Sequence, residues 1–128
     1  MRKIKFRAWD KKEKKWLGVN LHMSVIDGFL WWQFGYGCDP LSANEDIELM
    51  QYTGLIDKNG KEIYENDICR FITWENNYEI EIPTIDIIEF GDGSFTFEDL
   101  ALYEWMDEDH RIELEVIGNK FENQELLK

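Results

Sequence analysis

Apolar and charged residues alternate along most of this chain with a period of two. Near the N-terminus three apolar residues share one parity and three basic residues share the other: Ile4, Phe6 and Ala8 against Lys3, Lys5 and Arg7. Successive side chains of a strand point to opposite faces, so this pattern predicts a strand with one basic face. The polar run DKKEKK then predicts a turn into a second strand near Trp16. The N-terminus is therefore predicted to form a hairpin.

The same alternation recurs in several short segments between clusters of Gly, Asn and Asp, which is typical of antiparallel strands. Around residues 80–97, Pro83 is expected to interrupt one strand, and GDG to join the next two in a hairpin. The parity changes between Ile87 and Ile88, which indicates either a β-bulge or a strand covered on both faces. Residues 111–123 alternate again and predict a late strand.

Two segments depart from this pattern. Residues 28–37 are aromatic on both parities, so they form either a strand buried on both faces or an exposed aromatic interface, and residues 38–46 after them predict a loop. Residues 98–109 have helical spacing and predict one short helix near residues 98–107. The closing NQELLK adds one helical turn, and the chain as a whole is predicted to be mainly β.

Length and composition predict one folded domain over residues 1–128. The chain is 44% apolar and contains six tryptophans, enough to build a core without cross-links. Cys38 and Cys69 lack metal-binding spacing and are predicted to be free, packed thiols. The N-terminus lacks the apolar stretch of a signal peptide, and no segment has the length of a membrane span. We therefore expect a soluble, cytoplasmic protein.

The segment DKNGK, residues 57–61, invites comparison with ligand-binding loops. As a calcium-binding EF-hand loop it would carry Lys61, Glu62 and Ile68 where a ligand, a glycine and a bidentate glutamate are required. As a phosphate loop it lacks the Gly-Lys-Ser/Thr ending. We interpret it as a hairpin turn in which Asn59 and Gly60 both adopt positive φ angles.

Three segments carry a family resemblance. LMQYTGLIDKNGKEIYENDI (49–68), IKFRAWD (4–10) and EVIGNKFENQELL (115–127) together resemble the YopX family of phage and prophage proteins. The resemblance implies an all-β pseudo-barrel with adjoining hairpins and a short helix, encoded by a phage or prophage and located in the host cytoplasm. It implies no established activity, cofactor or catalytic residue. Asn66 and Gln124 stand where the family commonly has glycine and proline, and asparagine tolerates the left-handed backbone that such a turn needs.

Charge separates two functional hypotheses. The chain has 14 Lys/Arg and 27 Asp/Glu, but residues 1–20 carry a net charge of +6 and residues 21–128 carry −19. The acidity favours a non-enzymatic module that binds an unidentified host or phage protein. One form of this role is DNA mimicry, in which the carboxylates occupy the positions of DNA phosphates on a basic partner. The predicted partner surface comprises Glu104, Asp107, Glu108 and Asp109. A purely solubilising role for these acids stays open.

The alternative is nucleic-acid binding by the basic hairpin, with Lys3, Lys5 and Arg7 interleaved with aromatic residues. Against it, the acidic remainder repels phosphate, and Glu113 and Glu115 are expected to offer the basic face an intramolecular partner. The two histidines lie in no motif for a nucleophile or a zinc site. We predict no catalytic residue, metal site or cofactor, and no membrane partner.

Overall fold

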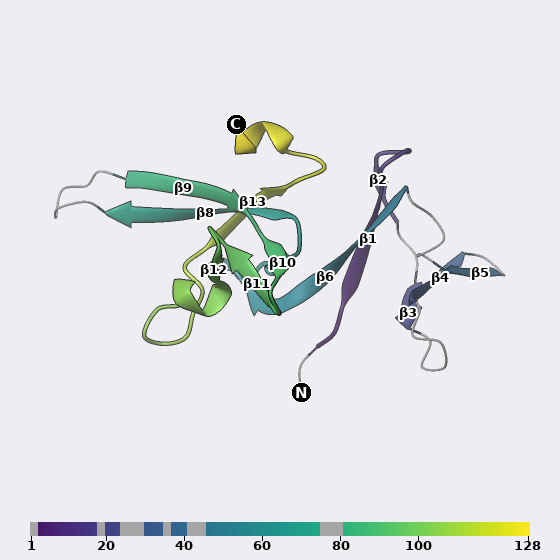
Figure 1. Ribbon diagram of the computed structural model, residues 1–128, viewed down its shortest axis with the longest axis horizontal. Helices are drawn as coiled ribbons and strands as arrows, with labels where there is room; N and C mark the ends of the chain where they lie inside the picture. Colours follow the sequence, from purple (N-terminus) through teal and green to yellow (C-terminus); the bar gives the residue numbers. More distant parts are fainter. Residues whose placement is uncertain (1–2, 18–19, 24–29, 35–36, 41–45, 75–80) are drawn as a thin grey trace. The chain divides into compact units, whose positions relative to one another are not determined.

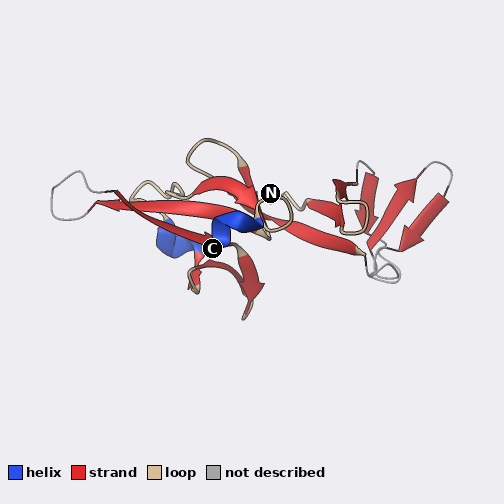
Figure 2. Cartoon of the chain, turned by 90° about the horizontal axis from the view of Figure 1, so that it is seen from above, coloured by secondary structure: helices blue, strands red, loops and turns tan. Residues whose placement is uncertain are grey.

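The computed structural model describes the chain except for residues 1–2, 18–19, 24–29, 35–36, 41–45 and 75–80 (Figure 1). Two compact units are present: an N-terminal unit, Ile4–Gln51, and a C-terminal unit, Tyr52–Lys128, which also includes the first three residues. Figure 2 shows strands along most of the described chain. The prediction of a mainly β fold is confirmed, and one sheet curls into a half-barrel. The single domain over residues 1–128 stays a prediction.

The N-terminal unit begins with the predicted hairpin. Strands β1 (Phe6–Asp10) and β2 (Lys15–Trp16) pair antiparallel, with Trp9 opposite Trp16. The first half of β6 (Ile47–Ile56) pairs with the other edge of β1. Asp10 Oδ1 accepts hydrogen bonds from the backbone N–H groups of Lys12 and Glu13, both at 3.0 Å. This local bonding explains why DKKEKK forms a turn.

A second antiparallel sheet in this unit places β4 (Leu30–Phe34) between β3 (Asn20–Met23) and β5 (Gly37–Pro40). The predicted loop over residues 38–46 is therefore wrong in its first part, because Cys38, Asp39 and Pro40 pair with β4. Residues 41–45 lie outside the described residues. The side chains of residues 28–37 also lie outside them, so the choice between core and interface for that aromatic segment stays open.

The C-terminal unit consists of short antiparallel pairings. The second half of β6 pairs with β7 (Glu62–Tyr64). The long β8 (Asp67–Trp74) lies between β13 (Glu115–Asn119) and β9 (Glu81–Ile87). The third group is β10 (Glu89–Gly91), β11 (Ser94–Phe97) and β12 (Leu100–Ala101), in that order. The 3-10 helices η2 (Leu102–Trp105) and η3 (Gln124–Leu127) are the helices of the described residues.

Two sequence features around β9 have a different meaning from the predicted one. Pro83 does not interrupt the strand but lies within β9, opposite Ile72. A proline is tolerated there because β9 is an edge strand, and the outer edge of such a strand needs no N–H donor. Ile88, where the parity changes, lies between β9 and β10. Its N–H donates to the Asp67 carbonyl at 2.8 Å, and its carbonyl accepts the Asn66 N–H at 2.9 Å. The parity change marks the transfer of the chain from one sheet to the next.

The core of the C-terminal unit forms where these strands meet η2. Its buried residues are Ile63, Cys69, Ile88, Phe97, Leu102, Ile112 and Leu114. The ring of Trp105 packs edge-on against Phe97 and Phe71, with centroids 4.9 and 5.0 Å apart, and its Nε1–H donates to the Phe97 carbonyl at 3.1 Å. The predicted short helix is present, but as a single 3-10 turn over 102–105, because β12 occupies residues 100–101.

The closing segment is held by a turn at Asn119. The Asn119 side-chain oxygen accepts the backbone N–H groups of Phe121 and Glu122, both at 3.0 Å. Gly118 packs against this turn so closely that a Cβ atom there would lie 2.5 Å from Asn123 Oδ1. Asn66, which stands where the family commonly has glycine, has φ of 67°, so the expectation that asparagine adopts the left-handed turn is confirmed.

Candidate functional site: a groove between two aspartate loops

The DKNGK segment forms a hairpin loop between Ile56 and Glu62, which pair across it. The Asp57 N–H donates to the Lys61 carbonyl at 2.7 Å, and the Gly60 N–H donates to the Asp57 carbonyl at 3.0 Å. Gly60 has φ of +86°, as predicted, but Asn59 is not among the described residues with positive φ. The prediction for Asn59 is therefore wrong: the loop is a turn followed by one left-handed residue, as in three-residue hairpin loops.

The side chain of Asp57 completes this loop and joins it to a distant strand. Its Oδ1 accepts the N–H groups of Asn59 and Lys61, both at 2.8 Å. Its Oδ2 accepts the N–H of Val116 at 2.9 Å, 59 positions further along the chain. The side chain is 4% exposed. Asp57 therefore fixes the loop against the beginning of β13.

A second loop, Asp107 to Arg111, repeats the same pattern of hydrogen bonds. The Asp107 N–H donates to the Arg111 carbonyl at 2.9 Å, and the His110 N–H donates to the Asp107 carbonyl at 3.0 Å. Asp107 Oδ1 accepts the N–H groups of Asp109 and Arg111, both at 2.9 Å. His110 has φ of 62° and takes the place of Gly60. We call residues 57–61 and 107–111 the two aspartate loops.

The sequence contains this repeat only as an aspartate followed four positions later by a cation, DKNGK and DEDHR. Sequence reasoning missed it because the second loop has no glycine at its left-handed position. The loops also differ in one bond. Asp107 Oδ2 accepts Arg111 Nε at 3.1 Å, within its own loop, instead of reaching another strand. The N–H donors, above all that of Arg111, hold the pKa of Asp107 below its ordinary value.

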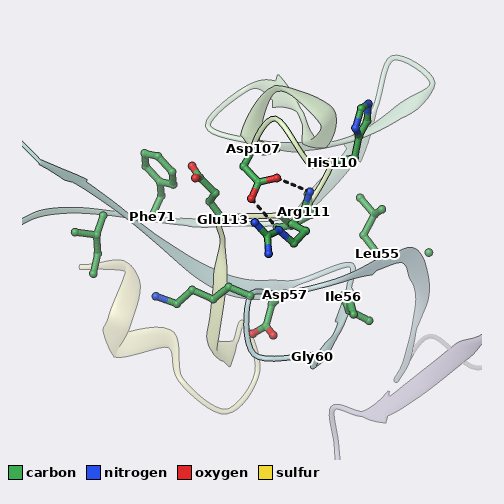
Figure 3. Close-up of a pocket in the computed structure, with 13 residues that line it drawn as sticks. Leu55, Ile56, Asp57, Gly60, Phe71, Asp107, His110, Arg111 and Glu113 are labelled. Carbon is green, nitrogen blue, oxygen red and sulfur yellow. Dashed lines mark hydrogen bonds and ion pairs between the residues drawn. The ribbon is translucent and has the colours of Figure 1, made fainter.

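The two aspartate loops line one groove of about 1090 Å³ (Figure 3). Its other walls are the end of β6, two residues of β8, and the segment that follows the second loop. The apolar lining residues are Leu55, Ile56, Phe71, Ile72 and Ile112. Of these Ile56 is 53% exposed, which is high for a large aliphatic side chain. The groove thus offers apolar surface to solvent.

Most charged groups at the groove are paired with one another. Glu115 Oε2 lies 2.6 Å from Arg70 Nη2 and 3.7 Å from Lys58 Nζ, and the hydrogen bond from Arg70 lowers the pKa of Glu115. The expectation that Glu115 pairs with the basic N-terminal face is therefore wrong, because β13 pairs with β8. Arg111 also contacts Asp109 Oδ2 at 3.0 Å. Within the described part of the chain, the exposed carboxylate of Glu113 has neither an ion pair nor a hydrogen bond.

The predicted acidic surface divides between η2 and the second aspartate loop. Glu104 and Glu108 are exposed, whereas Asp107 and Asp109 bind Arg111. Glu104 also accepts a hydrogen bond from the Tyr103 hydroxyl, which raises the pKa of Tyr103. Further exposed carboxylates, at Asp92, Glu98 and Asp99, lie on the turns between β10, β11 and β12. Sequence reasoning assigned Glu98 and Asp99 to the predicted helix and Asp92 to the GDG turn, and it included none of the three in the acidic surface.

The predicted basic surface is largely engaged within its own hairpin. Lys3 is exposed and groups with the C-terminal unit, whereas Lys5 and Arg7 are half-buried in the N-terminal unit. The Arg7 guanidinium lies 4.7 Å from the centroid of Trp16, and Trp16 packs edge-on against Trp9 at 4.9 Å. Trp9 is buried. These aromatic faces are therefore occupied by intramolecular contacts.

No constellation for metal chemistry is found among the described residues, where no three His, Cys, Asp or Glu side chains are grouped to hold an ion. Cys69 is a free, buried thiol whose pKa is raised by burial. The side chain of Cys38 lies outside the described residues. None of the described helices has the length and apolar character needed to cross a membrane.

Comparison with known proteins gives matches over nearly the whole chain. The family model YopX, described as YopX protein, matches residues 5–128. The chain is similar to the crystal structure of protein EF1440 from Enterococcus faecalis, at 30% identity and a TM-score of 0.66. It is also similar to the X-ray crystal structure of protein yopX from Bacillus subtilis, at 26% identity and a TM-score of 0.62. Each match covers 100% of this chain and 100% of the other. No curated protein matches.

Proposed function

Because this chain belongs to the YopX family, we propose that it is a phage- or prophage-encoded accessory protein that acts in the host cytoplasm as a non-enzymatic protein-binding module. Its partner is a basic protein of the host or the phage. The acidic face of the C-terminal unit makes the contact, with carboxylates in the positions that phosphates would take in a DNA-mimic complex.

One observation carries this proposal. Residues 71–110 contain 12 Asp/Glu and no Lys or Arg, and residues 52–128 as a whole contain 20 Asp/Glu against six Lys/Arg, a net charge of −14. Among the described acids of residues 71–110, the exposed ones lie on β10, on the turns of β10–β12, on η2 and on the second aspartate loop. Such a field attracts a basic surface and speeds the encounter with it, while it repels nucleic-acid phosphates.

Exposed apolar side chains in the same segment favour a protein as the partner. Phe90 is 57% exposed, Leu100 49% and Tyr103 68%. Aromatic side chains are enriched at protein interfaces and supply much of the binding energy there. Carboxylates supply the attraction at long range, and these apolar groups supply contact area once the partner has docked.

The alternative, nucleic-acid binding by the basic hairpin, has one observation in its favour. Four exposed lysines lie on the turn between β1 and β2 and at the start of β2: Lys11, Lys12, Lys14 and Lys15. Lys11 approaches Glu48 at 3.6 Å, which reduces the charge available to a phosphate. The engagement of Trp9 and Trp16 with each other removes the stacking platform that single-strand binding uses.

The two functions are separated by capture of host proteins on the immobilised full-length chain, with elution by a salt gradient. We expect a basic protein to elute at lower salt from the variant Glu104→Gln/Glu108→Gln. The matched control Glu13→Gln/Glu125→Gln changes the net charge equally at exposed sites elsewhere and should leave elution unchanged. Asp107 and Asp109 are left intact because they hold Arg111.

Gel-shift assays with DNA and RNA complete the test. We expect no appreciable binding at physiological salt, because the acidic unit opposes phosphate. Submicromolar binding of single-stranded nucleic acid that disappears when Lys3, Lys5 and Arg7 are replaced would overturn the proposal and make the basic hairpin the working surface.

A further inference from the structure

The groove between the two aspartate loops has the composition of a small docking site. Its apolar side chains come from three separated parts of the chain: Leu55 and Ile56 from β6, Phe71 and Ile72 from β8, and Ile112 after the second loop. Exposed aliphatic surface such as that of Ile56 gains free energy when a partner covers it.

The groove is preformed, because its two walls are closed by hydrogen bonds within the chain. Each aspartate loop is held by its own carboxylate and by two backbone bonds. The first loop is also joined to β13 through Asp57 and Val116. A preformed site pays little ordering cost when a ligand enters, so that more of the contact energy appears as affinity.

The charges of the groove select the sign of its ligand. Both lining cations already have acidic partners, since Lys58 lies beside Glu115 and Arg111 binds Asp107. Glu113 has no such partner within the described part of the chain. In Figure 3 its side chain points in the same direction as that of Phe71. An incoming cation would therefore find an acceptor there, whereas an incoming anion would find that both lining cations already have acidic partners.

Resting on the proposed function, we propose that this groove docks a short segment of the partner protein in which apolar side chains accompany a lysine or arginine. The apolar side chains cover Ile56 and Phe71, and the cation pairs with Glu113. The acidic residues around the groove add a negative electrostatic potential to the charge of Glu113. The ligand of the groove is therefore a segment of the same basic protein that the proposed function names as the partner.

The probe is a library of random 12-residue peptides displayed one per particle, selected on the full-length protein and on three variants. Peptides enriched on the wild-type protein should combine apolar residues with Lys or Arg, and their amide-shift perturbations in NMR spectra should centre on Leu55, Ile72 and Ile112. Glu113→Gln should weaken the selected peptides about tenfold, the effect of losing one charge-assisted hydrogen bond. Ile56→Ser should weaken them as well, because exposed Ile56 contributes contact area and its loss does not open the core.

The control is Glu125→Gln, which removes the same charge from an exposed residue of η3 that neither lines the groove nor belongs to the proposed acidic surface. It should leave peptide affinity within about twofold of wild type. Enriched peptides without Lys or Arg, no enrichment at all, or affinities that Glu113→Gln does not change would overturn the groove proposal. If host-protein capture still responds to Glu104→Gln/Glu108→Gln in that case, the acidic surface stands and only the groove fails. If capture also fails to respond, the proposed function itself is refuted.

Discussion

Replacing Asp57 by alanine tests the feature on which the architecture of the C-terminal unit depends most. Asp57 is buried, and its carboxylate accepts three backbone N–H groups, from Asn59, Lys61 and Val116. Asp107→Ala is the matched control, since Asp107 closes its own loop through the same two Oδ1 bonds, while its Oδ2 binds Arg111 of the same loop. The difference between the two variants therefore reports the hydrogen bond from the Val116 N–H, offset by the exposed Arg111 contact that only Asp107→Ala removes.

The expected magnitude follows from what each variant leaves unpaired. In Asp107→Ala the released N–H groups lie in an exposed loop and are hydrated, so the loss of stability is small. Asp57→Ala loses the equivalent loop bonds and also leaves the partly buried Val116 N–H without its acceptor, which adds about 1–3 kcal/mol. We therefore expect about 2–4 kcal/mol for Asp57→Ala in total.

Urea denaturation followed by far-ultraviolet circular dichroism measures both free energies of unfolding under the same conditions. Asp57→Asn is a useful third variant, because its amide retains one acceptor for the loop and presents an N–H₂ group or an oxygen to Val116, but not oxygens on both sides. It should fall between wild type and Asp57→Ala. Equal destabilisation by Asp57→Ala and Asp107→Ala would refute the claim that the hydrogen bond between Val116 and Asp57 stabilises the fold.

Three further predictions concern stability. Gly60→Val should lower the free energy of unfolding by about 1–3 kcal/mol through the positive φ of Gly60 alone, because no atom crowds the position of a Cβ there. Gly91→Val is the control: Gly91 has equal space and no positive φ, so this variant should shift the calorimetric midpoint far less. An unchanged midpoint for Gly60→Val would contradict the turn assignment. Removal of residues 115–128 should unfold the protein, because β13 and the hydrogen bond from the Val116 N–H to the Asp57 carboxylate are lost. A surviving near-ultraviolet circular dichroism spectrum would show that the segment is dispensable. Because Arg70 lowers the pKa of Glu115 in the folded state, the stability due to this pair is present above its ordinary value of 4.5 and is lost as the pH falls through the folded value. Glu115→Gln should therefore reduce the difference in melting temperature between neutral and acidic pH relative to wild type, and an identical pH profile for both proteins would exclude this linkage.

Local chemistry explains which elements could be predicted. The hairpin from β1 to β2 and the glycine at position 60 depend on alternation and turn residues within about ten positions, and both are present in the fold. Ile112 and Leu114 are buried, as the same alternation predicts, although they precede β13, which begins only at Glu115. The prediction of a positive φ at Asn59 was wrong. The φ angle of Asn59 depends on whether two or three residues close the hairpin, and the register between β6 and β7 sets that number.

What only the tertiary structure decided is which distant segments meet. Pro83 is harmless because β9 lies at a sheet edge, and Ile88 is fully buried because the chain changes sheets there. The hydrogen bond from the Val116 N–H to Asp57 joins residues 59 positions apart. The two aspartate loops, which line one groove, are about 50 positions apart. Period-two patterning shows that a strand has an apolar face but contains no information on which strand lies beside it, because many partners bury the same face equally well. The groove, and the position of Glu113 beside it, are consequences of that pairing, so they emerge only once each strand has its neighbours in the fold.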